Sequence, residues 1–167
     1  MDEKIANEWI RSVEEERGML RDNEIYPLLK KWADSIKGET LVDIGAGQGI
    51  CSEHIGRDDI RYVGIEPSEV LVNRARNKYG DKKKTFIVGD AYDIPLEDNT
   101  ADACLSVNVL FHLEDLGAAM KEMMRILKPS RPFLLITATR NTYDNWESFF
   151  ENPIKDGKIL DGKVNIP

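Results

Sequence analysis

The sequence predicts an α/β domain built on a mostly parallel β-sheet. Short apolar runs with the length of buried strands occur at residues 41–44, 61–65, 85–88, 101–107 and 133–137. Stretches with helical periodicity or helix-start signals separate these runs, and such alternation is typical of βαβ units. The first run leads directly into Gly45-Ala46-Gly47-Gln48-Gly49, where the glycines allow positive φ and the close approach of a ligand. With 167 residues, the chain is expected to form one domain.

The predicted elements follow one another with recognisable boundaries. Residues 1–36 are expected to be helical, because apolar residues recur there at helical spacing and Pro27 is tolerated in the first turn of a second helix. Further helices are predicted over 48–55, 68–79 and 114–128, each of them between two apolar runs.

The amino-acid composition limits the classes of partner. The net charge of −7 argues against a nucleic-acid partner, because contacts with phosphates need basic surfaces. Cys51 and Cys104 are expected to be small buried side chains, since neither a disulfide framework nor a metal-binding spacing is present. We find no signal peptide and no apolar run long enough to cross a membrane. A cytoplasmic protein with no membrane partner and no metal is therefore expected.

The spacing of the glycines indicates which kind of ligand the turn suits. Ile50 stands where the dinucleotide fingerprint requires its third glycine, and no Lys-Ser/Thr pair follows, so neither a pyrophosphate site nor a P-loop is predicted. Asp43, two residues before Gly45, would repel a diphosphate but suits a ligand that carries an ammonium and a sulfonium group. An ordinary tight turn between a strand and a helix is the alternative.

Glu66 ends the second predicted strand, about twenty residues after the glycine turn, at the place where dinucleotide folds carry their ribose-binding acid. Its two carboxylate oxygens can accept hydrogen bonds from the vicinal hydroxyls of a ribose. The alternative is an acidic residue that is favoured by the dipole of the following helix. Beside the glycine turn, the ribose role is favoured.

The stretch 41–49 resembles motif I of the class I S-adenosylmethionine-dependent methyltransferases, and the segment 89–96 resembles the loop after strand three in that family. The resemblance covers residues 39–138 and is greatest to the small-molecule, type 11 group. It implies S-adenosylmethionine as cofactor, S-adenosylhomocysteine as product, and contacts of Asp90 and Ala91 with adenine; a local turn made by Asp90 is the alternative. The expected cofactor-binding residues are Arg21, Asp43, Gly45, Ala46, Gly47, Glu66, Pro67, Asp90, Ala91 and Asn108.

Asn108 and His112 follow the fourth predicted strand, beyond the carboxyl end where ligands of open α/β sheets bind. The signature Asn/Asp-Pro-Pro-Tyr of amino-methyltransferases is absent here, which argues against the amines of nucleic-acid bases or glutamine as acceptors. A catalytic role of His112 as a base near neutral pH suits an acceptor that must lose a proton. A histidine that only shapes the pocket is an equal alternative.

The resemblance also implies how the single domain is divided. Residues 1–37 form a helical lid in which Arg21 holds the methionyl carboxylate, residues 39–138 form the cofactor-binding core, and residues 139–167 form a C-terminal segment. The implied fold is a three-layer α/β/α Rossmann-like sandwich with strand order 3-2-1-4-5 and right-handed crossovers. The family's sheet has two further strands that this chain is too short to supply, which leaves an edge for the pairing of two copies.

The activity implied by the resemblance is methyl transfer from S-adenosylmethionine to a small-molecule acceptor, which the sequence does not identify. A truncated, non-catalytic S-adenosylmethionine-binding module is the first alternative. A nicotinamide-dependent oxidoreductase is the second, and Ile50 disfavours it.

Overall fold

The computed structural model describes residues 3–11, 13 and 21–137, so the C-terminal segment predicted over 139–167 lies outside the described residues. The strands are β1 (Thr40–Ile44), β2 (Arg61–Glu66), β3 (Lys84–Val88), β4 (Ala103–Val107) and β5 (Phe133–Ile136). The helices are α1 (Glu3–Arg11), the π-helical turn η2 (Arg21–Ile25), α3 (Tyr26–Asp34), α4 (Cys51–His54), α5 (Glu69–Tyr79), the 3-10 turn η3 (Leu110–His112) and α6 (Leu116–Ile126). Of these helices, none combines the length and apolar character that a membrane span requires.

The described strands form one sheet in the order β3-β2-β1-β4-β5, and all neighbouring strands are parallel. This arrangement confirms the predicted fold class and strand order. The order reverses between β1 and β4, and ligands of open α/β sheets bind in the crevice beyond the strand ends at such a reversal. The topology therefore places a candidate site where the glycine turn leaves β1.

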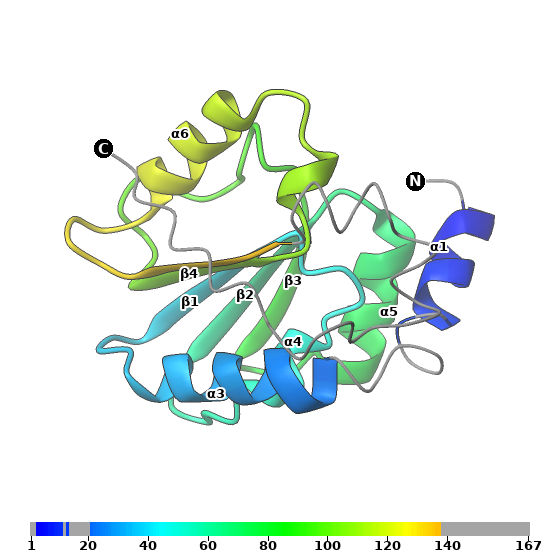
Figure 1. Ribbon diagram of the computed structural model, residues 1–167, viewed down its shortest axis with the longest axis horizontal. Coiled ribbons are helices and arrows are strands. Elements are labelled where there is room, and N and C mark those ends of the chain that lie inside the picture. The colour runs from blue at the N-terminus through cyan, green and yellow to red at the C-terminus, as the bar shows by residue number, and fades with distance from the viewer. Residues whose placement is uncertain (1–2, 12, 14–20, 138–167) are drawn as a thin grey trace, which may run out of the picture. The chain divides into compact units, whose positions relative to one another are not determined.

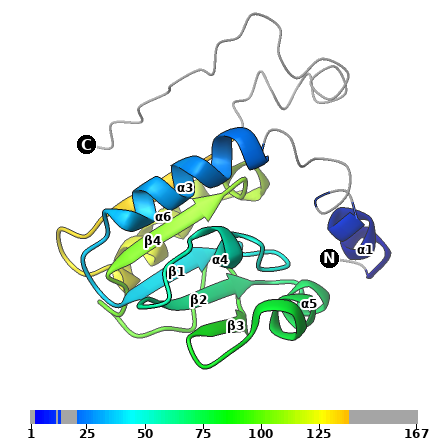
Figure 2. The same cartoon turned by 90° about the horizontal axis from the view of Figure 1, so that it is seen from below.

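Helices cover both faces of the sheet (Figures 1 and 2). On one face, Val42 and Ile65 belong to a buried cluster with Met123 of α6. On the other face, Tyr62 and Phe86 belong to a second buried cluster together with residues of α3, α4 and α5. Burial of these apolar side chains supplies most of the driving force that keeps the strand ends in register.

Among the differences between predicted and observed boundaries, two have a clear cause in the structure. The helix predicted over 48–55 is reduced to the single turn of α4, because Gly49 has φ of +84°, which an α-helix excludes, and the helix begins only after it. The strand predicted over 101–107 begins at Ala103. Ala101 instead forms a bridge with Leu127, so the first two residues of the apolar run lie ahead of the main ladder.

Candidate functional site

All of the predicted site residues except Arg21 lie at the carboxyl ends of strands or shortly after them. The N–H groups of Gly45 and Ala46 both donate to the carbonyl of Ile65 in β2, at 2.8 and 3.0 Å. The N–H of Asn108 donates to the carbonyl of Ile136 in β5, at 2.7 Å. These bonds continue the ladders beyond the strands, so the first residues of both loops are fixed by the sheet.

Gly45 and Gly49 allow close packing around the turn. A Cβ atom at Gly45 would lie 2.2 Å from Cγ2 of Val109, so only glycine lets the segment after β4 lie against the turn. A Cβ at Gly49 would lie 2.8 Å from the ring of Phe86 in β3. Both residues also have positive φ, of +76° and +84°. These two glycines therefore serve the packing of the turn as well as any approach of a ligand.

Glu66 is fixed between the glycine turn and the start of α5. Its Oε2 accepts the N–H of Gly47 at 3.1 Å, and its Oε1 accepts the N–H of Ser68 at 3.0 Å. Burial raises the pKa of Glu66, and the two N–H donors act in the opposite direction. An ionised carboxylate has about four acceptor sites, so each oxygen can accept a further hydrogen bond from a ligand.

Two buried polar atoms on residues at the glycine turn and at the start of α5 were not predicted from the sequence. Within the described structure, Nε2 of Gln48 and Oγ of Ser68 have no hydrogen-bond partner. Both residues are buried, at 2% and 3% exposure. Because buried polar groups are normally paired, these atoms point to a ligand or to water at the glycine turn. No local sequence signal distinguishes them from an ordinary polar turn.

Asp43 lies at 1% exposure below the glycine turn, and its carboxylate accepts a hydrogen bond from the hydroxyl of Tyr62. Burial raises the pKa of Asp43 to about 7, the Tyr62 hydroxyl opposes this rise, and the nearby Glu66 adds to it. The sequence did not indicate Tyr62. Its contact with Asp43 depends on the register in which Gly64, two residues further along β2, lies opposite Asp43.

In the loop after β3, Asp90 makes a local turn of the kind named above as the alternative to an adenine contact. Oδ1 of Asp90 accepts the N–H groups of Tyr92 and Asp93, at 2.7 and 3.0 Å. The residue is exposed, while Ala91 next to it is buried at 6% exposure. The turn uses one carboxylate oxygen and therefore fixes the loop without occupying the whole carboxylate.

The segment after β4 carries the remaining predicted residues. Asn108 has φ of +59°, a left-handed conformation that asparagine tolerates, and it turns the chain out of the sheet into η3. His112 ends this 3-10 turn, with its ring centroid 4.2 Å from that of Phe111. The residue is exposed overall, but partial burial of the ring lowers the pKa of His112. The imidazole is therefore neutral at pH 7 and able to accept a proton.

Arg21 begins η2 and lies close to α3 and α4. Burial raises the pKa of Tyr26, and the neighbouring Arg21 guanidinium acts against this rise. The pKa of the Cys51 thiol is raised by burial and by the charge of Asp43, and Arg21 again acts against it. Arg21 and Asp43 therefore both influence Cys51, the first residue after the glycine turn in α4. Of the other predicted residues, Ala46 is buried and Pro67 is exposed.

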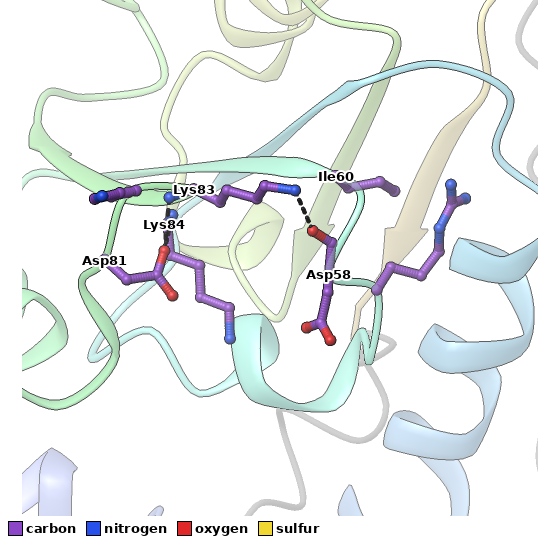
Figure 3. Close-up of a pocket in the computed structure, with 7 residues that line it drawn as sticks. Asp58, Ile60, Asp81, Lys83 and Lys84 are labelled. Carbon is purple, nitrogen blue, oxygen red and sulfur yellow. Dashed lines mark hydrogen bonds between the residues drawn. The ribbon is translucent and has the colours of Figure 1, made fainter.

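A cleft of about 400 Å³ lies at the amino ends of the strands, where β2 and β3 begin (Figure 3). Nζ of Lys83 donates to the carbonyl of Asp58 at 2.5 Å, and Asp81 accepts the N–H groups of Lys83 and Lys84. The lining thus stabilises its own turn and contains no predicted site residue. In the described part of the chain, no group of acidic, histidine or cysteine side chains is arranged to hold a metal ion.

Comparison with known proteins identifies the family. The model of the methyltransferase domain family matches residues 42–135, which is more than half of the chain. An uncharacterized methyltransferase of Mycobacteroides abscessus is 27% identical over 67% of this chain and 46% of its own length. Norajmaline N-methyltransferase of Rauvolfia serpentina is 29% identical over 68% of this chain and 41% of its own length. The chain thus spans less than half the length of these curated relatives.

A solved structure extends the comparison to three dimensions. The S-adenosylmethionine-dependent methyltransferase of Thermotoga maritima, described as a possible histamine N-methyltransferase, is 26% identical. The two structures align with a TM-score of 0.63, and the alignment covers 88% of this chain and 68% of the Thermotoga chain. The family match, the strand order and the glycine turn that leaves the central strand agree, and the chain belongs to the class I S-adenosylmethionine-dependent methyltransferase family.

Proposed function

We propose that the chain binds S-adenosylmethionine across the glycine turn and transfers its methyl group to a small-molecule acceptor. The observation that carries this proposal is the carboxylate of Glu66, which bonds to the N–H of Gly47 and so lies directly at the turn. When bound, the cofactor supplies an activated methyl group on a sulfonium centre. The residues around it need only bind, orient and, for a protonated acceptor, remove a proton.

The residues present fit such a cofactor. Glu66 has acceptor sites for ribose hydroxyls, and the buried Gln48 and Ser68 offer an unpaired donor and an unpaired hydroxyl on residues that adjoin the glycine turn and α5. Asp43 supplies negative charge below the turn, which favours a cationic ligand over a pyrophosphate. Asp90 and Ala91 are proposed to bind adenine.

Arg21 is proposed to hold the methionyl carboxylate as part of a lid formed by residues 1–37. Its position beside α3 and α4 supports this role, because Arg21 acts on Cys51 next to the glycine turn. A guanidinium can bind a carboxylate through two parallel hydrogen bonds.

A small-molecule acceptor is supported by charge and by similarity. The net charge of −7 disfavours a nucleic-acid substrate. One relative is named as an N-methyltransferase of norajmaline. Asn108 and His112, which follow β4, are the residues proposed to face the acceptor.

Titration calorimetry tests the cofactor assignment. We expect S-adenosylmethionine and S-adenosylhomocysteine to bind, because both present the ribose and adenine that Glu66 and Asp90 are proposed to hold. NAD serves as the control ligand, since Ile50 and Asp43 disfavour its pyrophosphate. Tight binding of NAD without binding of either S-adenosyl compound would refute the proposal.

The affinity for S-adenosylmethionine is expected to depend on pH through Asp43. Because the pKa of Asp43 is raised to about 7, its carboxylate is largely protonated at pH 6 and largely ionised at pH 8. A ligand that needs the ionised form should therefore bind about tenfold more tightly at pH 8 than at pH 6. S-adenosylhomocysteine, which lacks the sulfonium charge, should show a smaller change.

The variant Asp43→Asn isolates this contribution from that of Glu66. The pH dependence of S-adenosylmethionine binding should shrink in the variant, and an unchanged dependence would exclude Asp43 as its source. Folding stability supplies an independent check. The raised pKa means that the folded state binds an extra proton between the two pKa values, so stability falls as pH rises from about 4 to about 7, and the variant should gain stability relative to the parent at pH 8.

A further inference from the structure

The side chain of Tyr92 connects the loop after β3 with the segment that leads into α6. Its hydroxyl oxygen accepts the backbone N–H groups of Glu114 and Asp115, at 2.8 and 3.2 Å. Its own backbone N–H donates to the carboxylate of Asp90, at 2.7 Å. One residue therefore contacts both the proposed adenine side of the site and the segment that follows His112.

The segment between His112 and Glu114 is short and internally bonded. The N–H of His112 donates to the carbonyl of Val109 at 2.9 Å, and the N–H of Leu113 donates to that of Leu110 at 3.2 Å. Val109 in turn lies against Gly45 of the glycine turn. A short, internally bonded path therefore joins Glu114 to η3 and to the glycine turn.

A second attachment holds the same loop on α6 without Tyr92. The guanidinium of Arg125 donates to the carbonyls of Ile94 and Leu96, at 2.9 and 2.8 Å. The carboxylate of Glu122 accepts the N–H of Ile94 at 3.1 Å. The loop is thus fixed near the C-terminal half of α6, and loss of the Tyr92 hydroxyl should leave the fold intact. That hydroxyl contacts the other end of α6, the end that follows η3.

We propose that Tyr92 is a positioning residue that couples occupation of the cofactor site to the placement of the acceptor-side segment, residues 108–115. The inference rests on the proposed function, because it takes Asp90 and Ala91 as the cofactor side and His112 as the acceptor side. Tyr92 is 40% exposed, so its contribution lies in the two accepted hydrogen bonds more than in burial of its ring. Ligand bound at the Asp90 turn therefore fixes the start of α6 through one side chain.

Amide hydrogen exchange, resolved residue by residue, tests this coupling in the complete chain. In the parent protein, S-adenosylhomocysteine should slow exchange at residues 110–118 as well as at 89–93. In Tyr92→Phe, S-adenosylhomocysteine should still bind and protect 89–93, but the ligand-dependent protection of 110–118 should be lost. Exchange at Glu114 and Asp115 should rise about tenfold without ligand, as expected when ordinary hydrogen bonds are removed.

Tyr79→Phe is the matched control, because it makes the same chemical change at the C-terminal end of α5, before β3 begins. It should leave the ligand-dependent protection unchanged. A purely structural role of Tyr92 would lower the melting temperature and keep the protection of 110–118, and that result overturns the proposal. Protection confined to 89–93 in the parent protein overturns it as well. Calorimetry that shows no binding of S-adenosylhomocysteine to the parent would instead overturn the proposed function, and this inference with it.

Discussion

Replacing Glu66 by alanine is expected to weaken the binding of S-adenosylmethionine by about 1.5–3 kcal/mol, or roughly 10- to 150-fold in the dissociation constant. The loss has two sources. The variant lacks the proposed acceptor for the ribose hydroxyls, and it also lacks the carboxylate that accepts the N–H groups of Gly47 and Ser68. Calorimetric titration of both variant and parent with S-adenosylmethionine measures the effect.

Glu69→Ala is the matched control for this change, since Glu69 is exposed in the first turn of α5. The affinity of this variant for S-adenosylmethionine should stay close to that of the parent protein. Glu66→Gln separates charge from shape, because the amide keeps one acceptor oxygen and should lose less affinity than alanine. Equal binding by the Ala variant and the parent would show that Glu66 serves only to cap the turn.

Much of this fold could be predicted because its signals are local. Alternating apolar runs and helical patterns indicated the strands, whereas the strand order 3-2-1-4-5 came from the family resemblance. The glycine turn and Glu66 were identified by the same route, since each lies at the end of a strand whose boundary the sequence marks. The family resemblance then added the roles proposed for Asp90 and Ala91.

The contacts that the sequence did not indicate join residues far apart in the chain. Tyr62 reaches Asp43 only because the register of two parallel strands brings them to one face, and no pattern within either strand encodes that register. Val109 lies against Gly45 because β1 and β4 pair side by side in the sheet. The prediction from sequence also began the helix after the turn too early, because it did not foresee the positive φ of Gly49.

His112→Gln is expected to lower the rate of methyl transfer about 10²–10⁴-fold if the acceptor must lose a proton, while S-adenosylmethionine binds with nearly unchanged affinity. The imidazole of His112 follows β4 and can take that proton, because burial lowers its pKa and favours the neutral form. Glutamine retains hydrogen-bonding capacity but cannot act as a base. The measurement is transfer of labelled methyl groups to a panel of amine-, thiol- and hydroxyl-bearing metabolites.

The other histidine of the chain, His54, supplies the matched control, because its ring stacks on Tyr26 at 3.6 Å between α4 and α3. His54→Gln should retain transfer. The pH profile distinguishes a base from a packing residue. A base gives the parent protein a rate that rises with pH through the pKa of His112 and then levels off, and the variant loses this rise. Loss of rate and of cofactor affinity to the same extent, with the pH profile unchanged, would instead make His112 a residue that shapes the pocket.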